Sequence, residues 1–168
     1  MTSNVITRLA SATLLATALA GLPAPAGAAS GYTPEQVCGS GFHRVALGTR
    51  PVADQTNTVR GEVHLLYSPY TGEHCVVTVK SDFVGTPTST TATLLVRNSF
   101  FTPPLKYEDP ADPKYFKYYA GPVKANAHRK CVSFKGTISS PDSAIRASGG
   151  WGSFGDCGRQ PRRQRAFR

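Results

Sequence analysis

Long apolar runs are scarce in this sequence of 168 residues, and beyond its N-terminal region no segment approaches the ~20 apolar residues of a membrane-spanning helix. The one such run, residues 9–22, follows Arg8 and precedes Ala26-Gly27-Ala28, which fits the small-x-small pattern of signal-peptidase sites. Because the run is too short for a permanent anchor, the sequence predicts a cleavable signal peptide over residues 1–28. The alternative is a retained N-terminal membrane helix. No integral membrane segment is expected after the signal is removed.

Cysteine is also sparse, with four residues and no C-x-x-C pair of the kind that suggests zinc or a thioredoxin-like redox site. All four follow the predicted signal, and an even number in an exported chain favours two disulfides over metal ligation. Four cysteines allow three pairings. We favour Cys38–Cys75 with Cys131–Cys157, because each bridge then closes a moderate loop worth about 3–4 kcal/mol in the chain-entropy model.

Charge is unevenly distributed along the chain. Residues 29–158 hold 13 Lys and Arg against 10 Asp and Glu, a net charge of only +3. The last ten residues, 159–168, are too basic and proline-interrupted to pack, so they predict a disordered tail. Outside a cell such a tail could hold to anionic cell-wall or spore-surface polymer, and nucleic acid is not the expected partner. A solvated tail with no dedicated partner is the alternative. Its arginines are Arg159, Arg162, Arg163, Arg165 and Arg168.

Catalytic and cofactor signatures are absent as well. No two of the four histidines stand at a recognised metal-ligand spacing, although His64 and His74 could face each other across a predicted hairpin. Exposed polar positions on the outer face of a strand pair are the simpler interpretation of these two residues. The sequence therefore predicts a protein without enzymatic activity, metal or cofactor.

Helical periodicity is lacking over any stretch of ten residues, and apolar residues alternate with period two instead, as in half-buried strands. Turn-forming residues 68–73 indicate an antiparallel hairpin, and residues 102–113, with four prolines, predict an exposed loop. Gly121-Pro122 predicts a further turn. We expect an all-β domain over residues 29–158, either a small antiparallel sandwich or a barrel-like fold with two disulfides. The predicted strands are residues 42–47, 59–67, 75–80, 91–97, 115–119 and 132–138.

Aromatic residues are concentrated in residues 115–119, which contain Tyr115, Phe116, Tyr118 and Tyr119. Beside several lysines they could stack bases or sugars, or they could simply divide between a core and an outer face. The single tryptophan, Trp151, stands among glycines and is interpreted as a core residue on a flexible approach to Cys157.

Several motifs occur together in a fixed order, namely Cys38-Gly39-Ser40-Gly41-Phe42, Tyr118-Tyr119-Ala120-Gly121-Pro122-Val123, Arg129-Lys130-Cys131-Val132, Trp151 and Cys157-Gly158. In these motifs the chain resembles the spore-associated protein A family of secreted actinobacterial proteins, over roughly residues 38–158. The resemblance implies an exported protein found with spores or aerial hyphae, and it supplies no catalytic residue.

These observations predict a secreted, non-catalytic protein associated with the spore or hyphal surface. The first alternative is a secreted protease inhibitor or other extracellular binding protein, with residues 70–74 beside Cys75 as the candidate reactive loop. The second alternative is a secreted hydrolase with dispersed catalytic residues.

Overall fold

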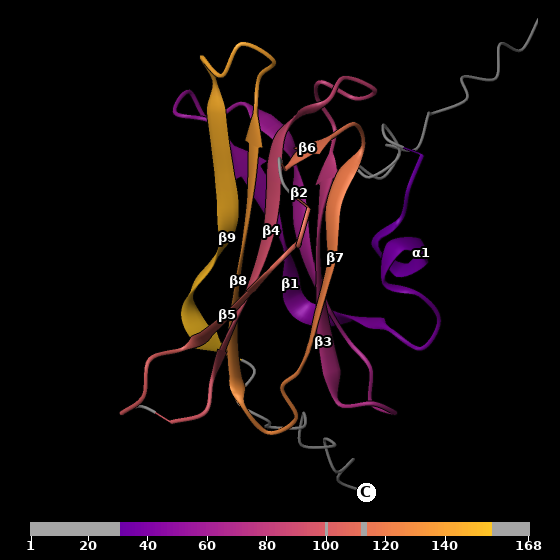
Figure 1. Cartoon of the computed structure of the whole chain (residues 1–168), viewed down its shortest axis with the longest axis vertical. Coiled ribbons are helices and arrows are strands. Elements are labelled where there is room, and N and C mark those ends of the chain that lie inside the picture. The colour runs from indigo at the N-terminus through magenta and orange to yellow at the C-terminus, as the bar shows by residue number, and fades with distance from the viewer. Residues whose placement is uncertain (1–30, 100, 112–113, 156–168) are drawn as a thin grey trace, which may run out of the picture.

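A computed structural model of the chain describes residues 31–99, 101–111 and 114–155 (Figure 1). No helix within these ranges is long and apolar enough to cross a membrane. The described residues form one short helix and nine strands: α1 Pro34–Cys38, β1 His43–Ala53, β2 Val59–Tyr67, β3 Glu73–Lys80, β4 Thr88–Arg97, β5 Leu105–Glu108, β6 Tyr115–Phe116, β7 Tyr119–Asn126, β8 Cys131–Ser139 and β9 Arg146–Gly155.

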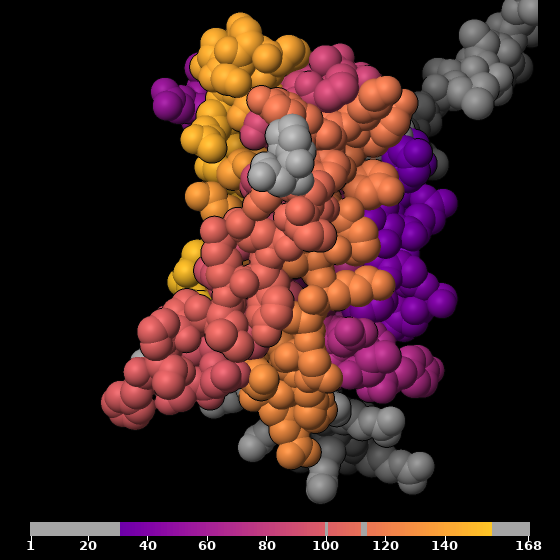
Figure 2. Space-filling view, viewed as in Figure 1, coloured from indigo at the N-terminus to yellow at the C-terminus, as the bar shows by residue number. Residues whose placement is uncertain are grey.

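Antiparallel pairing joins the strands into one sheet in the order β5-β4-β8-β9-β1-β2-β3-β7, with β6 paired to β4. The sheet curls until β7 approaches β4 and β5, so that it is nearly closed into a barrel (Figure 1). Across this closure Gly121 N donates to Asp109 Oδ2 at 2.9 Å, and Figure 2 shows residues 101–111 lying beside β7 on this face. The prediction of an all-β, antiparallel, barrel-like domain is confirmed.

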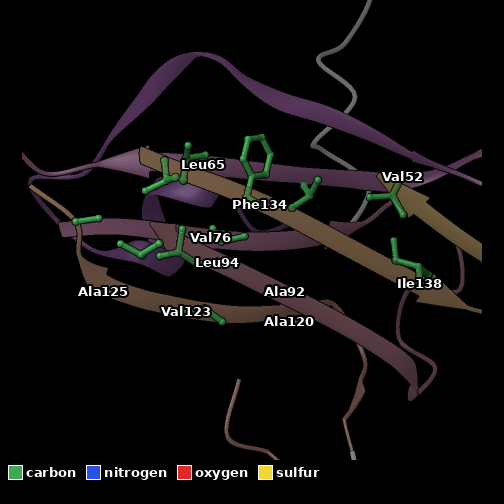
Figure 3. Close-up of a cluster of buried hydrophobic side chains, with 14 of the residues drawn as sticks. Val52, Leu65, Val76, Ala92, Leu94, Ala120, Val123, Ala125, Phe134 and Ile138 are labelled. Carbon is green, nitrogen blue, oxygen red and sulfur yellow. The ribbon is translucent and has the colours of Figure 1, made fainter. Parts of the chain in front are cut away.

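The barrel interior is filled by alternate residues of the strands, as the period-two patterns predict. Leu65, Val76, Leu94 and Phe134 converge from four different strands (Figure 3). Because each of these strands turns one face inward, their side chains exclude water from one continuous core. The buried members of the cluster are Val52, Val63, Leu65, Val76, Ala92, Leu94, Val96, Ala120, Val123, Ala125, Ala127, Val132, Phe134, Ile138 and Ala147.

A second, smaller cluster lies on the outer face of β2 and β3, where α1 covers it. Helix α1 begins with a capping box, in which Gln36 N donates to Thr33 Oγ1 and Thr33 N donates to the Gln36 side chain. Cys38 at the end of α1 forms a disulfide with Cys75 of β3, as predicted. Both faces of β3 are therefore buried. The cluster contains Cys38, Phe42, Leu66, Cys75, Val77 and Val79.

The two ends of the barrel differ in polarity. At the closed end, where β3 ends and β4 begins, the side chain of Lys80 lies inside the barrel and is 1% exposed. Its Nζ donates to Thr86 O at 2.9 Å, to Thr88 Oγ1 at 2.9 Å and to Phe116 O at 3.2 Å. Three acceptors satisfy the ammonium group, so the lysine joins β3 to β4 and β6 at this end.

Three predictions about secondary structure are corrected by the structure. Strand β5 lies within the predicted loop 102–113, because its four residues contain no proline and pair with β4. The predicted strand 115–119 is divided between β6 and β7. The predicted turn at Gly121-Pro122 lies inside β7, at a register shift against β3, where a residue without an N–H is tolerated.

Candidate ligand cavity at the open end of the barrel

Strand β1 contains a large bulge opposite β2. Arg44 pairs with Leu66 and Thr49 pairs with His64, so residues 45–48 lie against Leu65 alone. The bulge turns Leu47 outward, where it is 67% exposed at a φ of 59°. A bulge of this kind bends its strand and interrupts the hydrogen-bond ladder.

The other edge of β1 is also largely unpaired. In the described part of the chain its one partner position with β9 is Ala53 with Ser148, near the closed end. The open end of the barrel is the end where β1 and β8 begin and β2 and β9 end. Between Ala53 and this end, the described residues of β1 and β9 do not pair further. The barrel wall is therefore open between β1 and β9.

A cavity of about 420 Å³ occupies this opening. Residues of β1, β2, β8 and β9 line it, and most of its wall is apolar. A concave, largely apolar site of this size is typical of a small-molecule pocket, for which volumes of about 300–1,000 Å³ are usual. The apolar and aromatic lining residues are Val45, Ala46, Leu47, Leu65, Tyr67, Val132, Phe134 and Trp151.

Trp151 lines both this cavity and a neighbouring depression, which Arg50 also lines. Trp151 lies directly across from Phe134 in the β8–β9 pair, and its carbonyl accepts a hydrogen bond from Ser133 Oγ. The guanidinium of Arg50 lies 4.5 Å from the centre of the indole. Arg50 lines the depression and not the apolar cavity, so the guanidinium covers the indole from the depression side.

His43 and Arg44 are the basic residues among those that line the cavity. Arg44 Nε lies 2.6 Å from Glu35 Oε1 of α1, and this hydrogen bond lowers the pKa of Glu35. Because Glu35 neutralises Arg44, no uncompensated arginine charge faces the apolar wall.

Comparison with family models, curated proteins and solved structures gives no match to this chain.

Thr49, His64 and Glu62 form a hydroxyl–imidazole–carboxylate series outside the barrel interior. Thr49 Oγ1 lies 3.1 Å from His64 Nδ1, and Glu62 Oε2 lies 3.6 Å from His64 Nε2. Burial, reinforced by the positive charge of Arg44, lowers the pKa of His64 to about 4. An enclosed imidazole of such low basicity is poorly matched to general-base catalysis at neutral pH, so the series does not support a hydrolase.

The suggestion that His64 and His74 face each other is wrong. His64 pairs with Val77 across the hairpin, and His74 pairs with Tyr67, with ring centres 4.8 Å apart. Both histidines are buried, in contrast to the exposed positions that the sequence predicted. Among the described residues no three His, Cys, Asp or Glu side chains gather as a metal site.

The candidate inhibitor loop, residues 70–74, belongs to the tight turn between β2 and β3. Tyr70 is 87% exposed, and Gly72 N closes the turn by donating to Ser68 O at 2.9 Å. Strand-like recognition requires an extended segment, which a closed turn does not present. The geometry therefore favours the cavity over this turn as the binding site.

The predicted aromatic set is divided among different surroundings. Phe116 packs against the barrel core, Tyr119 packs against the cluster beneath α1, and Tyr115 and Tyr118 are exposed. These four side chains therefore do not form one stacking face. Of the aromatic residues that the sequence singled out, Trp151 is the one that lines the cavity.

The remaining predicted site residues lie outside the described residues. They are Cys157 and the tail arginines Arg159, Arg162, Arg163, Arg165 and Arg168. The pairing of Cys131 with Cys157 and the role of the tail therefore stay predictions.

Proposed function

We propose that this chain is a secreted, non-catalytic protein whose barrel binds an apolar small molecule at its open end. The observation that carries the proposal is the cavity of about 420 Å³ between β1 and the β8–β9 pair. Burial of apolar ligand surface there supplies a driving force of roughly 25 cal/mol per Å² before the costs of association.

The proposal includes export and two disulfides. The signal-like residues 1–28 support export, and the bridge Cys38–Cys75 is of the kind that persists in oxidising compartments. The second bridge, Cys131–Cys157, completes the pairing that we favour from the sequence. Two bridges in a domain of this size suit a protein that must stay folded outside the cell.

A fluorescent apolar probe tests the binding function. N-phenyl-1-naphthylamine, which is uncharged, should gain emission on entering the cavity and should receive energy from Trp151, the single tryptophan. Val45→Phe places a larger side chain in the cavity wall and should reduce probe affinity at least tenfold. Val59→Phe, at an exposed position of β2 outside the cavity, is the matched control and should bind like the wild type. Equal binding by both variants, or none by the wild type, would overturn the proposal.

Association with the spore or hyphal surface is the second part of the proposed function. It is supported by the resemblance to the spore-associated protein A family and by the five arginines of the tail. Anionic wall or spore-surface polymer is the proposed partner, because such contacts are electrostatic and screened by salt.

Washing hyphae and spores at low and high salt tests this surface association. The wild type should stay bound at low salt and be released at high salt. Replacement of all five tail arginines by glutamine should abolish retention, whereas replacement by lysine should preserve it because the charge is kept. Protein found only in the culture fluid at every growth stage would contradict a surface role and leave the ligand-binding role to be judged by the probe.

A further inference from the structure

Resting on the proposed function, we propose that the ligand is an uncharged, flat aromatic molecule of two to three fused rings that stacks on Trp151. Three features of the structure point to this class of ligand: the size of the cavity, the two faces of the indole, and the position of the charged residues.

The size of the cavity sets the upper and lower bounds of the ligand. An apolar cavity of about 150 Å³ accommodates benzene. The cavity between β1 and β9, at about 420 Å³, has nearly three times that volume. A single ring would leave much of the apolar wall without contacts, whereas two or three fused rings would cover it.

The shape of the ligand follows from the aromatic residues of the wall. Tyr67, Phe134 and Trp151 contribute rings from three different strands. Aromatic pairs prefer offset-stacked or edge-to-face arrangements, which favour a planar ring system over a saturated skeleton of the same size. A planar ligand on the cavity face of the indole would also contact Phe134, which lies directly across from Trp151 in the β8–β9 pair.

Arg50 gives the indole two unequal faces. Its guanidinium covers the indole from the depression side, 4.5 Å from the ring centre. A cation in this position is attracted by the π electrons and draws them toward itself. The cavity face of Trp151 is consequently a better partner for an electron-rich ring, such as a phenol or naphthol, than for an electron-poor one.

The residues that line the cavity favour an uncharged ligand. Arg44 is held by Glu35 at 2.6 Å, His43 is exposed, and the other residues that line the cavity carry no charged side chain that could pair with a buried carboxylate or ammonium group. Moving an ionised group into such a wall without a partner is strongly unfavourable. A neutral ligand avoids this cost.

Three probes with the same bicyclic ring skeleton test the inference on the full mature protein by isothermal titration calorimetry. They are 2-naphthol, which is neutral and aromatic, decahydro-2-naphthol, which is neutral and saturated, and 2-naphthoate, which is aromatic and anionic. We expect 2-naphthol to bind roughly 3- to 10-fold more tightly than decahydro-2-naphthol, as expected for one aromatic pair. We expect 2-naphthoate to bind at least tenfold more weakly than 2-naphthol.

Two variants separate stacking from simple burial. Trp151→Leu should abolish the preference for 2-naphthol while decahydro-2-naphthol still binds, and Trp151→Phe should retain part of the preference. Arg50→Gln leaves the apolar wall unchanged and should bring the affinity for 2-naphthol closer to that for decahydro-2-naphthol. The Arg50 variant keeps the inference testable should Trp151→Leu fail to fold.

The outcomes distinguish the inference from the function on which it rests. Equal affinity for 2-naphthol and decahydro-2-naphthol would overturn the aromatic class and leave a general apolar pocket. Tighter binding of 2-naphthoate would overturn the uncharged class and indicate recognition of an anion by Arg44. Failure of all three probes together with N-phenyl-1-naphthylamine would overturn the binding function itself.

Discussion

The surroundings of His64 hold its pKa well below the ordinary value for a histidine. Burial, together with the charge of Arg44, lowers its pKa from the ordinary 6.5 to about 4. Between these two values the unfolded chain binds a proton that the folded chain does not. The stability contributed by the neutral ring is therefore fully present above pH 6.5 and is lost as the pH falls toward 4.

Urea unfolding between pH 7 and pH 5 tests this consequence. We expect the free energy of unfolding of the wild type to fall by about 1–2 kcal/mol over this range, since one proton contributes at most about 1.4 kcal/mol per pH unit. His64→Gln, which cannot be protonated, should flatten the dependence. His43→Gln, at an exposed position, is the control and should leave it as in the wild type. An unchanged slope in the His64 variant would show that other groups cause the loss.

The burial of His64 also shows why the environment of a single side chain is hard to predict from the sequence. Period-two alternation predicted that His64 points to the other face of β2 than Val63 and Leu65, and this prediction is correct. Alternation cannot reveal that a segment elsewhere in the chain covers the outer face. Helix α1 and Arg44 both precede His64 by at least 20 residues in the sequence. They lie close to the outer face of β2, so His64 faces outward from the barrel and is nevertheless buried.

At the scale of elements, the bulge of β1 holds the cavity open. Gly48 is buried there, and a Cβ at this position would lie 2.7 Å from Leu65 O and 2.8 Å from Val45 O. Both neighbours are backbone atoms, so the bulge would have to move to accommodate a side chain.

Gly48→Ala should therefore lower the free energy of unfolding by about 1–3 kcal/mol, the range observed for overpacked sites, and should weaken probe binding. Gly152→Ala is the matched control, because a Cβ there meets no atom within 4 Å. Urea unfolding and titration with N-phenyl-1-naphthylamine measure the two effects. Normal probe affinity in a destabilised Gly48 variant would mean that the bulge does not shape the cavity.

The disulfide Cys38–Cys75 fastens α1 to the outer face of β3. It spans 37 residues, and the chain-entropy model gives a bridge of that length about 4 kcal/mol of stabilisation. The double variant Cys38→Ala, Cys75→Ala should lose roughly this amount in urea unfolding. Amide hydrogen exchange should become faster in α1 and remain slow in β8. Equal acceleration in both elements would show that the bridge stabilises the whole barrel and not the attachment of the helix.

Sequence patterns identified strands unevenly, for physical reasons. Strands β2, β3 and β8 follow the predicted alternation because each turns a regular apolar face inward. Strand β9 was missed because glycines hold four of its ten positions and supply no side chain to alternate. Gly149 is required there, since a Cβ would lie 2.0 Å from Pro51 O of β1. The cavity was missed for the same reason, because it depends on how β9 approaches β1.

At the scale of the whole molecule, the barrel has one closed end and one open end. The closed end is occupied by Lys80, whose ammonium group is satisfied by three oxygens of neighbouring segments. The open end contains the largely apolar cavity between β1 and β9. The proposed ligand would therefore enter beside the bulge of β1.

This architecture couples occupancy of the cavity to the stability of the whole barrel. A ligand that binds the folded chain alone raises the free energy of unfolding by about 2.7 kcal/mol at a free concentration of 100 times Kd. N-phenyl-1-naphthylamine should thus raise the wild-type Tm in a concentration-dependent way, measured by circular dichroism. Val45→Phe, which places the phenyl ring in the cavity, should unfold at a Tm independent of the probe. A parallel rise in both proteins would mean that the probe binds elsewhere on the folded surface, because the linkage must disappear when the site is filled.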